Sequence, residues 1–415
     1  MAEIRPFRGW RYDLSRIGSL EPIIAPPYDV LSLEQAKDLW DRHPYNVTRI
    51  ILGDPSGVKC DESADPARHE KATSTFEKWK RSGILVQDAE PSVYLVEDRF
   101  EWRGSMHQRR GILCLVHAEE LNRGIILPHE RTLAAPIADR FRLLSLSRAH
   151  LSPVYMLCED PDRTLRSQFE KTVTDAPLAR IRNRDAALEH RMWKISDRRV
   201  LESIAETVRS RPFLIADGHH RYTTALAYAK EQGGELPEAS WILIYLAPVP
   251  DPGVVLSSIH RMVQAPPIPL EVLEKIASIR TGKVSWESFE KDKAPLALLN
   301  GNEGDMRLLA SWKADSLIHP DLRNVPSVLL NDGILRPICG LHLERTEDQR
   351  KVKYAHDANE VVQTLAKSGG IGFWLRPLEV TDVLRVAEAG HVLPQKSTYF
   401  FPKVMDGFVM HTLDP

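Results

Sequence analysis

The chain lacks the features that mark several broad classes of protein. Its 415 residues contain no apolar run near the roughly 18 to 20 residues that a membrane-spanning helix needs. Lys and Arg (55) nearly balance Asp and Glu (57), so the formal net charge is −2 and we expect no broad electrostatic binding to DNA or a membrane surface. The first residues, MAEIRPFRGW, contain no apolar segment of a secretion signal, so we expect a cytoplasmic protein.

Cysteine is scarce and scattered along the chain. The four cysteines, Cys60, Cys114, Cys158 and Cys339, form no CxxC pair, which excludes a zinc ribbon and argues against a disulfide framework. Cys114 and Cys158 lie in apolar runs, where small thiols are commonly buried, so we expect both in the core. This sparse use of cysteine also agrees with a cytoplasmic protein.

The sequence reads as mixed α/β and contains no internal repeat or low-complexity tract. Hydrophobic periodicity predicts helices over residues 69–83, 219–230, 358–367 and 380–389. It predicts strands over 47–53, 92–100, 109–120, 152–160, 190–197, 212–218, 241–248 and 256–263, with the last continuing the same sheet. The polar segment around Gly104 should form the loop of a hairpin between 92–100 and 109–120.

A proline cluster, QAPPIPLE (264–271), predicts a boundary between two domains. The first domain would be an α/β core over residues 1–265. The second would be an α+β region over residues 266–415, and it would contribute the segment QKSTYFFPK.

The segment FLIADGHHRYTTALAYAK (213–230) carries the strongest functional signal. A buried strand, an Asp-Gly turn and an amphipathic helix follow one another without spare residues. The first turn of such a helix has unpaired N–H groups and the positive end of the helix dipole, which favour an anion. The pattern therefore predicts a phosphate-binding strand–turn–helix.

Polar residues gather at this turn. His219, His220 and Arg221 add side-chain donors, and Gly218 permits close backbone approach or a positive φ. Asp217 could bind a magnesium ion or cap the helix. The alternative is an ordinary helix start with solvated polar residues. Neighbouring residues on a helix point about 100° apart, which disfavours one metal ion shared by the two histidines.

Two other segments offer catalytic residues. LPHERT (127–132) contains His129 and Glu130, and a carboxylate beside a histidine can act as general base for a hydroxyl. The alternative is a surface turn. APPYDV (25–30) offers Asp29, which the rigid Pro-Pro pair can aim, although the same residues also suit an ordinary loop.

The remaining candidates are basic or hydroxyl residues. Lys396, Ser397 and Thr398 in QKSTYFFPK supply a cation and two hydroxyls for a phosphate, but the glycines of a Walker A loop are missing. An edge strand with polar flanks is the alternative. Arg140 beside Asp139 is a further phosphate-binding candidate or else a surface ion pair. The pair Arg109 and Arg110 is expected to be solvated.

The segment ADGHHRYTTAL (216–226) resembles the signature of the DUF1015 family, which is related to the ParB and free serine kinase superfamily. Other matching stretches occur in the same order: FRGWRYD (7–13), APPYDVLS (25–32), LPHERT (127–132), ADR (138–140), LSPVYML (151–157) and LPQKSTYFFPK (393–403). The resemblance implies a ParB-like α/β core. It also implies that Gly218, His219, His220 and Arg221 hold nucleotide phosphates.

Free serine kinases transfer phosphate from a nucleotide to the serine hydroxyl with magnesium. We therefore expect a nucleotide-dependent phosphotransferase that acts on a small hydroxyl-bearing metabolite such as serine, with ATP or ADP and Mg²⁺ as cofactors. Glu130, or else Asp29, would accept the hydroxyl proton. The alternative is a nucleotide-binding regulatory or ParB-like protein without kinase activity. DNA is not an expected partner, because neither a helix-turn-helix nor a basic stripe is evident.

Overall fold

A computed structural model describes residues 1–54, 66–173, 176–183, 187–300, 305–313 and 318–414, so Cys60 lies outside the described residues. The chain forms two compact units. The first comprises Met1–Pro128, Thr132–Val254 and Pro402–Pro415, and the second comprises His129–Arg131 and Val255–Phe401. The units divide after Val254, before the proline cluster, and the predicted domain boundary after residue 265 stays a prediction.

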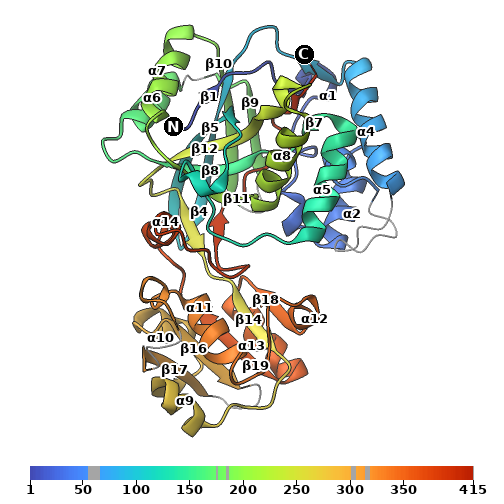
Figure 1. Ribbon diagram of the computed structural model, residues 1–415. Coiled ribbons are helices and arrows are strands. Elements are labelled where there is room, and N and C mark those ends of the chain that lie inside the picture. The colour runs from blue at the N-terminus through green and yellow to red at the C-terminus, as the bar shows by residue number, and fades with distance from the viewer. Residues whose placement is uncertain (55–65, 174–175, 184–186, 301–304, 314–317, 415) are drawn as a thin grey trace. The chain divides into compact units, whose positions relative to one another are not determined.

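A mixed sheet forms the centre of the first unit (Figure 1). Among the described residues it has nine strands, in the order β6-β11-β8-β12-β5-β4-β10-β9 with β1 beside β5. Their bounds are β1 (Ile4–Arg5), β4 (Val93–Trp102), β5 (Ser105–His117), β6 (Ile126–Leu127), β8 (Val154–Glu159), β9 (Ala179–Asn183), β10 (Leu188–Ile195), β11 (Phe213–Asp217) and β12 (Trp241–Val249). β11 runs parallel to β6 and antiparallel to β8, so Asp217 lies at the carboxyl end of an inner strand, as predicted.

Helices cover this sheet. α6 (Thr164–Thr172) and α7 (Arg198–Val208) pack against β5 and β1, whereas α8 (His219–Gln232) packs against β8 and β12. α5 (Ala134–Ser147) packs on α8, and α4 (Pro66–Arg81) packs on α5 (Figure 1). The core between strands and helices includes Cys114 and Cys158, both fully buried as predicted.

Local signals in the sequence explain several of these elements. The hairpin of β4 and β5 turns at Arg103 and Gly104, which both have positive φ. The capping box of Ser32 and Gln35 begins α2 (Leu33–Arg42). α4 ends shortly before Gly83, which also has a positive φ. Short-range chemistry is therefore enough to set these boundaries.

Two predicted strands are wrong in type or in place. Residues 47–53 contain no strand, and Thr48–Ile51 forms the short helix α3. Just before it, the side chain of Asn46 accepts hydrogen bonds from the backbone N–H (3.0 Å) and the hydroxyl (2.8 Å) of Thr48, an Asx turn that favours a helical start. Residues 256–263 do not continue the first sheet. They split into β13 (Val255–Ser257), which pairs with β20 (Tyr399–Phe401), and β14 (His260–Val263), which joins the sheet of the second unit.

The second unit is built on an antiparallel sheet with the order β15-β17-β16-β19-β14-β18, six strands among the described residues. The other strands are β15 (Ala277–Lys283), β16 (Leu296–Asn300), β17 (Asp305–Trp312), β18 (Val352–Ala355) and β19 (Ile371–Leu375). Its helices include α9 (Leu270–Ile276), α10 (Trp286–Lys291), α11 (Pro326–Leu330), α13 (Ala358–Ser368) and α14 (Val380–Glu388). α13 packs on β14 and β19 over a core that contains Trp374 and Phe289.

These elements confirm the predicted mixed α/β class. Strands from distant parts of the sequence pair in both units, and helices cover the sheet of each. Within the described part of the chain, no helix combines the length and the apolar character that crossing a membrane requires.

Candidate functional site

A charged network crosses three neighbouring strands of the first unit. Arg109 on β5 is fully buried and donates to Asp98 on β4 through Nε (3.0 Å) and Nη2 (2.6 Å). Nδ1 of His190 on β10 lies 2.7 Å from the other oxygen of Asp98. The guanidinium also lies over the rings of Tyr155 and Tyr245, at 4.9 and 5.3 Å from their centroids. The prediction that Arg109 is solvated is therefore wrong, because the strand register puts a carboxylate directly beside it.

This network holds the C-terminal segment of the chain. Nη1 of Arg109 donates to the carbonyl oxygen of Pro402 at 2.6 Å. The next residue, Lys403, places its Nζ 2.5 Å from Oδ1 of Asp217 at the end of β11. Further along, the backbone of Asp406 exchanges hydrogen bonds with Ala25 in the APPYDV segment. Segments from both ends of the chain thus meet the motif at 217–221.

Two cations neutralise Asp217. Lys403 binds one carboxylate oxygen, and Nη2 of Arg221 binds the other at 2.6 Å. Arg221 also donates to the carbonyl oxygen of Pro153. Burial alone would raise the pKa of Asp217, but Lys403 and Arg221 hold it well below its ordinary value. In the structure Asp217 is therefore an ionised carboxylate with its opposite charges already supplied.

Further carboxylates surround Arg221. Burial raises the pKa of Asp406 to about 7, and the nearby charges of Asp29 and Asp217 add to this effect while Arg221 and Ser152 oppose it. Neither carboxylate oxygen of Asp406 makes a hydrogen bond of normal geometry. Asp29 is exposed and lies on the 3-10 turn Tyr28–Val30. We call Asp29, Asp217, Asp406, Arg221 and Lys403 the Arg221 cluster.

The turn that begins α8 is mostly buried. Gly218 has φ +90°, and a Cβ there would lie 2.9 Å from Nε of Arg221. The side chains of His219 and Arg221 are buried, and Nε2 of His220 accepts the backbone N–H of Leu133 at 2.9 Å. The alternative of a solvated polar helix start is therefore wrong. The turn is also less open than the predicted anion site requires, because Arg221 is engaged by Asp217.

Arg140 is part of a second buried charge group. Its Nε donates to Asp139 at 2.8 Å, and its guanidinium lies 4.1 Å from the ring centroid of Tyr28. Asp139 also binds Nη2 of Arg68 (2.5 Å) and Nε2 of His69 (2.9 Å). Burial would raise the pKa of Asp139, but His69, Arg140 and Arg68 hold it well below its ordinary value. The alternative of a surface ion pair is wrong for Arg140.

A small cavity connects the two charge groups. Its volume is about 50 Å³, enough for one or two water molecules. The lining includes Tyr28, Arg140, Ser152, Arg221 and Thr224. The structure thus brings APPYDV, Arg140 and the turn of α8 together in the first unit.

The second unit joins two other predicted segments. Oε1 of Glu130 accepts hydrogen bonds from the backbone N–H groups of Ser397 and Thr398 (both 3.2 Å) and from the Thr398 hydroxyl (3.1 Å). Nε2 of His129, which is fully buried, lies 2.7 Å from the same hydroxyl. Lys396 adopts a positive φ in this loop. Glu130 therefore positions the loop through an oxygen with three donors, and its role as general base stays a prediction.

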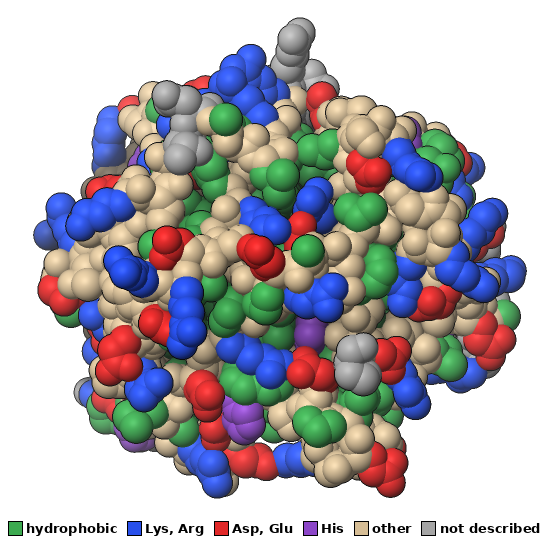
Figure 2. All heavy atoms as spheres, turned by 90° about the horizontal axis from the view of Figure 1, so that it is seen from above, with side chains coloured by type: hydrophobic (Ala, Val, Ile, Leu, Met, Phe, Trp, Pro, Cys, Tyr) green, Lys and Arg blue, Asp and Glu red, His purple; other side chains and the backbone are tan. Residues whose placement is uncertain are grey.

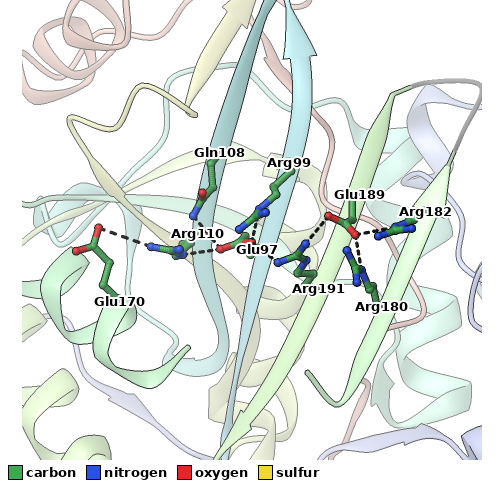
Figure 3. A network of polar contacts seen from close by, with 9 residues as sticks. All are labelled: Glu97, Arg99, Gln108, Arg110, Glu170, Arg180, Arg182, Glu189 and Arg191. Atoms are coloured by element: carbon green, nitrogen blue, oxygen red, sulfur yellow. Dashed lines mark hydrogen bonds and ion pairs between the residues drawn. The ribbon is translucent and has the colours of Figure 1, made fainter. Parts of the chain in front are cut away.

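Arg110 belongs to an arginine-rich network on the first-unit sheet (Figure 3). Glu97 is fully buried and accepts from Arg99 (2.7 Å) and Arg110 (2.8 Å). Arg191 connects Glu97 (3.8 Å) to Glu189 (2.9 Å). These arginines face carboxylates within the sheet. On the face drawn in Figure 2, basic and acidic side chains are likewise interspersed.

Motif reasoning missed Asp98, His190 and Asp406 as members of these groups. Asp98 and His190 stand in strands that read as ordinary paired strands, and only the register places both beside Arg109. Asp406 lies in no motif that points to a site. Local sequence carries no signal for it, because its importance comes from burial beside Arg221.

Solved structures with some similarity to the chain come from several proteins. A free serine kinase variant in complex with ADP is 13% identical, with 69% of this chain and 87% of that chain covered and a TM-score of 0.36. SbnI with a C-terminal truncation, from Staphylococcus aureus, is 10% identical, with coverages of 72% and 86% and a TM-score of 0.38. A conserved hypothetical protein from Pyrococcus furiosus is 14% identical, with coverages of 72% and 95% and a TM-score of 0.36.

No curated protein matches the chain. A family model does match it, and the match runs over residues 4–325, which is most of the sequence. The description of that family is "Protein of unknown function (DUF1015)". The chain therefore belongs to the DUF1015 family, as its motifs predicted.

Proposed function

We propose that this chain is a nucleotide-dependent phosphotransferase that acts on a small hydroxyl-bearing metabolite such as serine. The observation that carries the proposal is the Arg221 cluster, which places two cations and three carboxylates at the carboxyl end of β11. Phosphoryl transfer relies on cations that hold the phosphates and on carboxylates that hold a metal ion. The cluster contains both kinds of group at the turn that resembles a nucleotide-binding signature.

A phosphate would compete with Asp217 for its two cations. Arg221 can bind phosphate oxygens in a bidentate manner, and Lys403 can act as a point charge. Both now bind the two oxygens of one carboxylate, an arrangement that a phosphate group can also satisfy. Gly218, with its left-handed backbone, allows the phosphate to approach the chain closely. We assign Gly218, His219, His220 and Arg221 to phosphate binding.

The carboxylates of the cluster fit a magnesium ion. Mg²⁺ prefers oxygen ligands, and Asp406 has two oxygens without a hydrogen bond of normal geometry. The neighbouring charges of Asp29 and Asp217 help to raise the pKa of Asp406, and a cation would offset this repulsion. Asp217 and Asp406 would hold the ion, which would neutralise phosphate charge.

Three side chains are candidates for the proton acceptor: Asp29, Glu130 and His129. Asp29 is the exposed carboxylate of the Arg221 cluster, whereas Glu130 already accepts three hydrogen bonds on one oxygen. An exposed carboxylate can receive a substrate hydroxyl without losing existing contacts. We therefore place Asp29 first among the three.

Calorimetric titration of the full chain with ATP, ADP and AMP, with and without Mg²⁺, tests nucleotide binding. Phosphorus NMR of the same mixtures with serine tests transfer. Arg221→Ala should weaken binding, and Arg11→Ala is its matched control, because Arg11 binds the buried Asp88 at 3.0 Å in the same unit. The absence of binding to every nucleotide, or an equal loss in both variants, would contradict the proposal.

The alternative is a nucleotide-binding regulatory protein without kinase activity. The internal pairing of the Arg221 cluster favours this alternative. Asp217 binds Lys403 at the position where a phosphate would bind, and this contact helps to fix the segment that begins at Pro402. A nucleotide that displaced Asp217 would release this segment. Nucleotide binding without transfer to any hydroxyl compound, together with faster hydrogen exchange over residues 402–410, would support the alternative.

A further inference from the structure

Three side chains of the second unit place possible metal ligands close together. His319, Asp321 and His391 each offer one ligand atom, and these atoms all lie within 4.8 Å of one another. Oδ2 of Asp321 lies 3.1 Å from Nε2 of His391 and 3.5 Å from Nδ1 of His319. The centroids of the two imidazole rings are 4.3 Å apart. One carboxylate oxygen therefore sits between two imidazoles.

Two separate parts of the chain supply these ligands. His319 and Asp321 flank Pro320 at the start of the 3-10 turn Pro320–Leu322, where proline restricts the backbone. His391 follows α14, and its backbone N–H donates to the carbonyl oxygen of Val386 at 3.0 Å. The backbone thus holds both segments independently of any metal, so the ligands are largely positioned in advance.

The two distances between the carboxylate and the imidazoles fit tetrahedral coordination. With metal–ligand bonds of about 2.0 to 2.2 Å, two ligand atoms of a tetrahedral zinc ion lie about 3.3 to 3.6 Å apart. The distances of 3.1 and 3.5 Å need only small adjustment to reach this spacing. Two histidine nitrogens and one carboxylate oxygen are a donor set that zinc accepts, with a water molecule in the fourth position.

Apart from the 3.1 Å hydrogen bond between Asp321 and His391, which an ion would replace, the described contacts of these ligand atoms are weak. Nδ1 of His319 accepts the backbone N–H of Asp321 at 3.4 Å, a long hydrogen bond that a metal ion could replace. Arg385 reaches the carbonyl oxygen of Asp321 at 3.5 Å rather than its carboxylate. The three side chains are also open to solvent, at 54%, 44% and 26% exposure for His319, Asp321 and His391, so an ion and its water can enter.

We propose that His319, Asp321 and His391 bind a divalent transition-metal ion of the zinc class. Such an ion would join the 3-10 turn at Pro320 to the end of α14 within the second unit. The proposal does not depend on the nucleotide chemistry proposed above, because it uses other residues and its test contains no nucleotide.

Titration of the chelator-treated full chain with Co²⁺, followed by visible absorption, reports this site directly. We expect one saturable ion with the absorption of nitrogen and oxygen ligands. Affinity should fall at least about 10-fold in His319→Ala, Asp321→Asn and His391→Ala, since each loses one ligand. Zn²⁺ should raise the unfolding temperature of the parent chain and not of these variants.

His342→Ala is the matched control. Nδ1 of His342 lies 3.3 Å from Glu344, so it forms a histidine–carboxylate pair on the same unit, and within the described part of the chain this pair belongs to no group of three possible ligands. This variant should bind Co²⁺ like the parent chain. Retention of parental affinity in either His319→Ala or His391→Ala, or an equal loss in His342→Ala, would overturn the assignment. Failure of the parent chain to bind Co²⁺ and Zn²⁺ would also overturn it.

Discussion

Lys403→Met tests the competition between Asp217 and a ligand phosphate. Methionine keeps much of the length and apolar character of lysine and removes the charge that lies 2.5 Å from Asp217. The side chain of Lys403 is only 8% exposed, so water screens this pair little. A hydrogen bond to a charged group contributes about 1.5 to 3 kcal/mol. If Lys403 binds phosphate, nucleotide affinity should therefore fall by about 10- to 150-fold.

The same substitution should lower stability in a pH-dependent manner. Lys403 helps to hold the pKa of Asp217 below its ordinary value, so this carboxylate stabilises the folded chain above the unfolded pKa of about 3.9. That contribution is lost as the pH falls through the lower folded pKa. Removing Lys403 raises the folded pKa, so the stability difference between parent and variant should be largest near neutral pH and should narrow in acid.

Lys194→Met provides the matched control for Lys403→Met. Asp88 resembles Asp217 because it also binds one arginine, Arg11 (3.0 Å), and one lysine, Lys194 (3.3 Å). The control should lose stability without losing nucleotide affinity. Calorimetric titration at a temperature where both variants give the parental circular dichroism separates the two effects. Parental affinity in a folded Lys403→Met variant would refute the competition, as would an equal loss in the control.

Three further substitutions probe the buried charges of the first unit. Arg109→Met should lower the free energy of unfolding, measured with urea, by about 3 to 5 kcal/mol, because Asp98 loses its buried cation. A decrease below about 1 kcal/mol would contradict this prediction. The pKa of Asp406 is raised to about 7 in the folded chain, so the free energy of unfolding of the parent should fall as the pH rises from about 4 through 7. Asp406→Asn should remove this pH dependence, which thermal unfolding at about pH 5 and about pH 8 measures. Gly218→Ala should lower the free energy of unfolding by about 1 to 3 kcal/mol, because φ is +90° and the new Cβ would meet Arg221. An unfolding temperature equal to that of the parent would contradict this prediction.

Local sequence patterns were sufficient to predict those helices, strands and turns that interactions between neighbouring residues determine. The hairpin around Gly104, the helix over 69–83 and the strand–turn–helix at 213–230 all occur as predicted. Residues 47–53 show the limit of such patterns. Their β-branched residues favour a strand, yet the side-chain bonds of Asn46 to Thr48 select a helical turn. A single Asx turn can therefore override the strand propensity of a short apolar run.

The burial of Arg109 could not be predicted from its neighbours in sequence. Two adjacent arginines on a strand point to opposite faces of the sheet, and either face can be the one exposed to solvent. Only the pairing of Asp98 with both Arg109 and His190 identifies the face that is buried and compensated. Charge burial is a property of the assembled sheet, so it becomes visible only when the strand register is known.

The motif at 217–221 identified the right place but not its electrostatic state. Read alone, it is a helix start with exposed amides and basic side chains, which would attract any anion. In the folded chain, Lys403 and Asp406 come from the C-terminal segment and complete the cluster, so its cations already have a carboxylate partner. A ligand must therefore bind Arg221 and Lys403 more tightly than Asp217 does, because these two cations are already paired. This requirement favours a multiply charged phosphate brought with a metal ion over a simple anion, and it makes the affinity depend on Lys403, which lies far from the motif in sequence.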